Sequence, residues 1–250
     1  MGTADADANL NQFINQHIDS VMALTTIMHL LQFTDSTFPV GTFSFSNGLE
    51  TASFENIVHD ARTLEEFTRS QAYQAAFSDG VAALHVHRAY LRGDYGTIAH
   101  ADRYLLMFKM NAEARLMLRR MGKKLAELSM RLFPENEMIG KWLEEINSET
   151  VPGTYPVAQG LAFAAAGIDE KSLFSSHQYG IINMVLSAAL RCVKVSHYDT
   201  QRILFKLASE ADSMYDQAKE MDLEEMHAFY PQLDILASLH EKGNMRMFMN

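Results

Sequence analysis

Cysteine is almost absent from this chain, which has Cys192 as its single cysteine in 250 residues. One cysteine can form neither an intrachain disulfide nor a multi-cysteine metal site, and it fits the reducing cytoplasm, where we expect the protein to work. Proline and glycine are also scarce, with five and thirteen residues. So few turn-forming residues favour helices over a turn-rich β fold.

Positive charge is in short supply as well. The chain has 21 lysines and arginines and 31 aspartates and glutamates, which gives a formal net charge of -10. This balance argues against nucleic acid or an anionic membrane as the partner. The longest apolar run, residues 179–195, contains Arg191 and Lys194 and is expected to be a buried helix, not a membrane span. Residues 1–11 lack the basic and apolar regions of a signal peptide.

Motifs for nucleotide binding and catalysis are missing too. The interval from Gly41 to Gly48 is not a phosphate-binding P-loop, because Leu49 occupies the position where lysine would reach the phosphates. The chain has no H-E-x-x-H motif, no G-x-S-x-G elbow and no G-x-G-x-x-G turn. We therefore expect no catalytic residue, no metal ligand and no cofactor bound by this chain.

Ten histidines nevertheless raise the possibility of a metal site. His85 and His87 form the best pair, but residues two apart on a helix point in nearly opposite directions and cannot share an ion. We interpret one as packed and the other as solvated. Glu224 and His227 offer E-x-x-H spacing without a second copy. The alternative function is therefore a metal-dependent all-α enzyme with a buried carboxylate and histidine site.

Apolar residues recur at helical spacing along most of the chain. With 48% hydrophobic residues and no convincing alternating strand or repeat, the sequence predicts one all-α bundle of about ten helices. We expect a flexible tail and helix start over residues 1–20, and a single domain over residues 21–250. Capping boxes at Thr63–Glu66 and Asp222–Glu225 predict two helix starts. The predicted helices cover residues 10–32, 48–55, 63–77, 80–91, 97–133, 138–146, 157–166, 172–195, 199–209 and 231–240.

Residues 35–50, DSTFPVGTFSFSNGLE, combine turn formers with large aromatic side chains. Phe38, Phe43 and Phe45 would each gain about 1.5–3 kcal/mol from full burial, whereas Pro39 prevents a simple helix. We predict an ordered apolar loop held against the body of the protein or against another chain. Its serine hydroxyls are expected to satisfy loop backbone groups, since no histidine lies nearby in the sequence.

Two further segments could serve partners. Asn111 and Arg115 are four residues apart and would share a helix face, either as a polar patch for a partner or as an ordinary solvated face. Residues 245–249, Met-Arg-Met-Phe-Met, space three thioethers in a way that could bind Cu(I). An adaptable tail for a partner, or packing within the chain, suits these methionines better.

The loop at residues 35–50 resembles the signature of the UreF family of urease accessory proteins. That signature has an acidic residue, then F-P-x-G-x-[FY]-[ST], then S-x-G-L-E. Four later stretches follow in the family's order, at residues 111–122, 155–160, 187–204 and 234–248. One departure is the segment 195–201, which is about three residues shorter than usual, lacks the family's proline and has Thr200 in place of glycine.

The resemblance implies an all-α, cytoplasmic and dimeric protein without catalysis of its own. UreF proteins bind UreD (UreH in some organisms) and recruit the nickel-carrying GTPase UreG, so that the assembly delivers nickel to apo-urease. An influence on GTP hydrolysis is also implied. A helical adaptor for another GTPase is a third possibility that the signature disfavours.

The resemblance also implies two sets of partner-binding residues, by matched position. Residues at or behind the GTPase-facing surface would be Ser44, Ser46, Gly48, Glu50, Asn111 and Arg115. Residues that dock UreD would be Ile235, Leu239, His240, Arg246, Met247 and Phe248.

Overall fold

The computed structural model describes residues 22–41, 45–228, 230–241 and 247–248, and this part of the chain contains helices and no strand, as predicted. The α-helices are α2 (Leu24–Thr34), α3 (Leu49–Phe54), α4 (Ala61–Ala75), α5 (Val81–Arg92), α6 (Tyr95–Met107), α7 (Ala112–Leu132), α8 (Glu137–Asn147), α9 (Tyr155–Ala165), α10 (Glu170–Cys192), α11 (His197–Ala208), α12 (Ala211–Ala218) and α13 (Pro231–His240). A π-helical turn η2 (Ala76–Gly80) joins α4 to α5, and η3 (Leu223–Glu225) is a short 3₁₀ helix.

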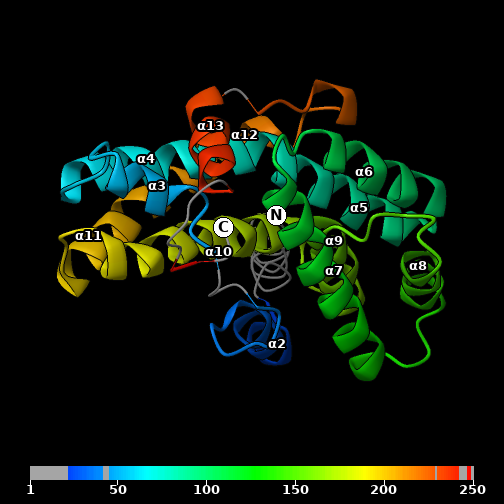
Figure 1. The fold of residues 1–250 in the computed structure, drawn as a ribbon. Coiled ribbons are helices and arrows are strands. Elements are labelled where there is room, and N and C mark those ends of the chain that lie inside the picture. The colour runs from blue at the N-terminus through cyan, green and yellow to red at the C-terminus, as the bar shows by residue number, and fades with distance from the viewer. Residues whose placement is uncertain (1–21, 42–44, 229, 242–246, 249–250) are drawn as a thin grey trace, which may run out of the picture.

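Helix α10 is the axis of the bundle (Figure 1). It runs through the middle of the molecule and packs against α2, α3, α4, α5, α9, α11 and α12. Its buried side chains, such as Phe174 and Val185, lie along most of its length, as expected for an apolar helix surrounded by others. None of the described helices is both long and apolar enough to span a bilayer.

The larger part of the core lies where α5, α7 and α9 meet, and it includes Trp142 and Phe163. The buried carboxylate of Asp102 on α6 joins three segments there. It accepts hydrogen bonds from Trp142 Nε1 at 3.1 Å, from the Gly153 amide at 2.9 Å and from the Thr154 amide at 2.8 Å. A second apolar cluster lies between α3, α4, α10, α11 and α13. This second cluster supports the candidate site.

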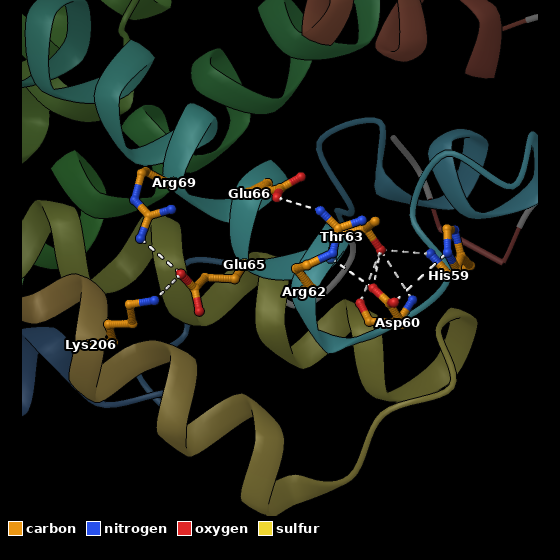
Figure 2. A network of polar contacts seen from close by, with 8 residues as sticks. All are labelled: His59, Asp60, Arg62, Thr63, Glu65, Glu66, Arg69 and Lys206. Carbon is orange, nitrogen blue, oxygen red and sulfur yellow. Dashed lines mark hydrogen bonds and ion pairs between the residues drawn. The ribbon is translucent and has the colours of Figure 1, made fainter.

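The N-terminus of α4 corrects one prediction (Figure 2). The N-cap is Asp60, whose carboxylate accepts from the Thr63 amide at 2.8 Å, while the Asp60 amide donates to the Thr63 hydroxyl at 3.1 Å. The predicted Thr63–Glu66 box is therefore wrong, because Thr63 is the third helical residue and not the cap. Glu66 instead pairs with Arg62 at 3.0 Å.

The predicted helix over residues 97–133 is two helices, α6 and α7. Asn111 has an extended backbone and caps α7, because its side-chain oxygen accepts from the Ala114 amide at 2.7 Å. Arg115 donates to the Lys109 carbonyl at 2.6 Å and so closes the break. The Lys109 ammonium in turn forms an ion pair with the buried carboxylate of Asp79. The break is therefore a fixed turn between α6 and α7 that ends at Asn111. We call it the α6–α7 corner.

The other predicted helices agree with the structure to within a few residues, except the one over residues 10–32: α2 begins at Leu24, residues 22–23 are not helical, and residues 10–21 lie outside the described residues. Helix α13 has the predicted bounds, and α11 begins at His197 because Ser196 caps it in place of Asp199. Helix α12 was not predicted. The expected N-terminal tail and the domain boundary at residue 21 lie outside the described residues.

The aromatic loop packs against the body of the protein, as predicted for Phe38 and Phe45. The Phe38 ring meets Phe33 of α2 edge to face, with ring centroids 5.4 Å apart, and Phe45 is buried beside Met117 of α7. Phe43 lies outside the described residues.

Candidate protein-docking site

The carboxylate of Glu50, in the first turn of α3, binds the C-terminal segment of the chain. Its Oε1 accepts from the Met247 amide at 2.7 Å, and its Oε2 accepts from the Phe248 amide at 3.1 Å. Oε2 also lies 3.0 Å from Nε2 of His240 on α13. A single ionic side chain therefore fixes two backbone amides and one imidazole, and charge-assisted bonds of this kind are the strong ones.

His240 extends this network to α7. The ring is only 3% exposed, and its Nδ1 lies 2.9 Å from Oε2 of Glu113. The next residue, Glu241, accepts from the amides of Ala112 and Glu113 at 2.7 and 3.1 Å, and so satisfies two free donors at the start of α7. The three helices α3, α7 and α13 are thereby held to one another by polar contacts.

Close backbone contact also joins α3 to α13. Gly48 precedes α3 with a φ of +79°, and a Cβ atom there would lie 2.9 Å from the Ala237 amide nitrogen. Glycine is needed both for the left-handed conformation and for the space. The Phe248 ring is buried nearby and lies 5.4 Å from the Arg191 guanidinium.

The predicted partner residues separate into buried and exposed groups. Ser46, Gly48 and Asn111 are buried and so lie behind the surface. The large apolar side chains of Ile235, Leu239 and Met247 are 57%, 47% and 60% exposed. We call these three residues the C-terminal surface.

The structure brings together residues that the sequence assigned to two partners. Glu50, predicted to face the GTPase, contacts His240, Met247 and Phe248, which were predicted to dock UreD. Arg115 is half-buried at the α6–α7 corner. Ser44 and Arg246 lie outside the described residues.

A cavity of about 140 Å³ lies behind this network and reaches Asn111, Ala237 and Phe248. The charged groups that line it include Asp79 and Lys109. Burial acts to raise the pKa of Asp79, but Lys109 outweighs it and holds that pKa below its ordinary value.

His177 lines the same cavity and is 2% exposed. Burial lowers its pKa to about 4, against the opposing charge of Asp79. Its Nδ1 lies 2.8 Å from Oε1 of Gln159, so Nδ1 carries the hydrogen of a neutral ring.

Among the described residues, no group of three or more histidine, cysteine or carboxylate side chains could hold a metal ion. His85 and His87 point to different partners, the carbonyls of Met221 and Ile168, as their spacing predicted. His87 is buried and His85 half-buried, so His85 is less solvated than expected. The ring of His227, from the E-x-x-H match, stacks on an aromatic ring of η2.

Sequence reasoning missed the roles of Glu113, Glu241, Asp79 and Lys109. Glu113 and Glu241 do lie within stretches that resemble the family, which is the one signal that could have marked them. Nothing in the sequence pattern connects Asp79 to Lys109, because the π-helical turn that carries Asp79 and the break that carries Lys109 meet only in the fold.

Together these observations define an all-α protein with an exposed apolar surface anchored by a buried carboxylate–histidine network. The family model described as UreF matches residues 58–208 of this chain. Urease accessory protein UreF 2 of Brucella canis is 46% identical over 237 residues, which cover 95% of this chain and 97% of that protein. Urease accessory protein UreF of Yersinia pseudotuberculosis is 42% identical over 229 residues, covering 92% and 100%. The chain belongs to the UreF family of urease accessory proteins.

Proposed function

We propose that this protein is a non-catalytic cytoplasmic scaffold that joins UreD (UreH) to the GTPase UreG and so directs nickel into apo-urease. Family membership supports a role in urease maturation. The observation that carries the finer proposal is the exposed C-terminal surface, whose backbone is fixed by Glu50. Nickel is cargo in this proposal, and we expect it to be held by the assembly rather than by this chain.

The C-terminal surface is the proposed docking site for UreD. Exposed apolar side chains gathered on one element are typical of protein interfaces, and methionine adapts its shape to a partner. Ile235 and Leu239 are four residues apart on α13, so they share a helix face. Met247 is tied to the same region through the Glu50 carboxylate.

The α6–α7 corner is the proposed contact for UreG. Arg115 lies there, among the exposed apolar side chains of Met107, Met110 and Leu116, which are 72%, 69% and 46% exposed. A cation framed by apolar side chains is a common arrangement at interfaces, where arginine is enriched. Through this contact the protein would influence GTP hydrolysis by UreG.

Helix α2 supports the proposal of a homodimer. Leu24, Met28 and Leu31 are 82%, 65% and 59% exposed, and Met28 and Leu31 line a groove with Leu128 and Leu132 at the end of α7. In Figure 1, α2 lies below α10, near the lower end of α7. An apolar helix with this exposure would be covered by a second copy in a dimer.

The test is co-purification of the tagged chain with UreD and UreG of the same genome, sized by light scattering with and without GTP. We expect a ternary complex that Leu239→Asp disrupts by placing a charge in the apolar interface. The matched control is Leu91→Asp on α5, where the leucine side chain is 67% exposed. Leu91 is distant in the sequence from the residues of the C-terminal surface. A chain that binds neither protein, yet carries tightly bound metal, would contradict the scaffold and support the metal-dependent enzyme.

A further inference from the structure

His240 makes two hydrogen bonds that a neutral imidazole cannot make together. Its Nε2 and Nδ1 lie 3.0 and 2.9 Å from carboxylate oxygens of Glu50 and Glu113. Ionised carboxylates only accept hydrogen bonds, and a neutral imidazole has one donor. Both contacts therefore require a hydrogen on each ring nitrogen, which is the imidazolium form.

We propose that His240, as an imidazolium, is a positioning residue that holds residues 247–248 in the docking conformation and releases them when it loses its proton. The mechanism depends on Glu50, whose Oε2 accepts from both the His240 ring and the Phe248 amide. The ring fixes the orientation of the carboxylate, and the carboxylate fixes the two amides. Only the identity of the docked partner rests on the proposed function.

Within the described part of the chain, the charged and titratable groups near His240 come from α3, α7, α10, α13 and the α6–α7 corner. They are Glu50 of α3, Glu113 and Arg115 of α7, Asp234 of α13 with Glu241 after it, Arg191 and Cys192 of α10, and Lys109 at the α6–α7 corner. The two groups in contact with the ring are both carboxylates, and the ring is buried, which strengthens their attraction for an imidazolium. After deprotonation the ring keeps at most one of the two hydrogen bonds.

Release with rising pH follows from this geometry. A neutral ring presents a lone pair to one of the two carboxylates and cannot hydrogen-bond to both. The ring then no longer fixes the orientation of the Glu50 carboxylate. Residues 247–248 then lose their anchor, and the C-terminal surface loses Met247. Docking should be strongest while His240 is protonated and should weaken once the ring is neutral.

The direct test is ¹⁵N NMR of the histidine rings in the whole chain, with hydrogen exchange of the 247 and 248 amides. We expect both His240 nitrogens to be protonated at neutral pH, and both amides to lose at least about tenfold in protection, relative to the intrinsic exchange rate at each pH, once the ring is deprotonated. A neutral single tautomer at neutral pH would overturn the proposal. These measurements need no partner, so they decide the role of His240 even if UreD does not bind.

Variants extend the test to docking. His240→Gln is neutral and should bind UreD about tenfold more weakly with no pH dependence over the range where the wild type weakens. His197→Gln, at an exposed residue of α11, is the control and should match the wild type. If His240→Gln does not fold, Glu113→Gln removes one of the two charges and should move the release midpoint to lower pH. An unchanged midpoint in that variant would contradict the proposal.

Discussion

Glu50 and His240 are 190 positions apart in the sequence, and their side chains meet at 3.0 Å in the interior of the site. Three donors, one ring nitrogen and two backbone amides, converge on the Glu50 carboxylate. The contact joins the start of α3 to the end of α13. The C-terminal surface is therefore built on a residue of the aromatic loop region rather than on α13 alone.

Removal of this carboxylate should be costly. With His240 as the imidazolium proposed above, Glu50→Ala leaves a buried cation and two amides without their acceptor, and breaking one partner of a buried ionic pair typically costs about 3–5 kcal/mol. Because the Glu50 side chain is 18% exposed, we expect the lower part of that range, roughly 3 kcal/mol, in the free energy of unfolding by urea. The control Glu55→Ala changes an exposed carboxylate of the same region. Equal stability of the two variants would contradict the central role of Glu50.

The contact of Gly48 with α13 gives a second prediction. Gly48→Ala adds a Cβ atom 2.9 Å from the Ala237 nitrogen at a φ of +79°, so α13 must move as well as the loop. Gly93→Ala also has a positive φ, +71°, but its Cβ would meet nothing within 4 Å. We expect about 1 kcal/mol of destabilisation at Gly93 and at least about 2 kcal/mol at Gly48, measured by urea unfolding. UreD binding should fall only for Gly48→Ala, and a loss in both variants would argue against a contact specific to α13.

Helices α7 and α8 each carry a glycine, and the two substitutions by alanine have opposite expected effects. A Cβ on Gly122 would lie 2.1 Å from the Gly153 carbonyl oxygen, which stands at the start of α9, whereas a Cβ on Gly140 of α8 meets only the flexible end of Met130 at 3.5 Å. Alanine is favoured over glycine in a helix by about 1 kcal/mol. Gly140→Ala should therefore raise the melting temperature, and Gly122→Ala should lower it by several degrees because α7 and α9 are forced apart. A stabilised Gly122→Ala variant would show that these helices do not pack as described.

These cases show what the sequence could predict and what it could not. Helix periodicity predicted α10 and α13 well because their apolar residues or their capping signals are local. The break at residues 108–111 was missed although Asn111 is a local N-cap residue, and the ion pair of Lys109 with Asp79, which also holds the break, forms across the fold. For the same reason the signature loop pointed to Glu50, but no local pattern could show that His240 is its partner.

Acid should destabilise the protein through His177. Its pKa in the folded state is lowered to about 4 from an ordinary value of 6.5, because the ring is buried. Between these pH values the unfolded chain binds more protons than the folded one, so stability falls as the pH falls through this window. The shift corresponds to a loss of roughly 3 kcal/mol by pH 4. His177→Gln should flatten that part of the curve of unfolding free energy against pH, whereas His197→Gln should leave it unchanged.

The exposed apolar face of α2 predicts how the proposed homodimer would form. Met28→Glu places a carboxylate in the groove that Met28 lines, and in a symmetric dimer the substitution occurs twice in one interface. Since each chain already carries a net charge of -10, added negative charge at the contact should favour separation. Light scattering should give a dimer for the wild type and for Leu91→Glu, and a monomer for Met28→Glu. A wild-type monomer would contradict the homodimer, and a dimeric Met28→Glu variant would place the interface away from α2.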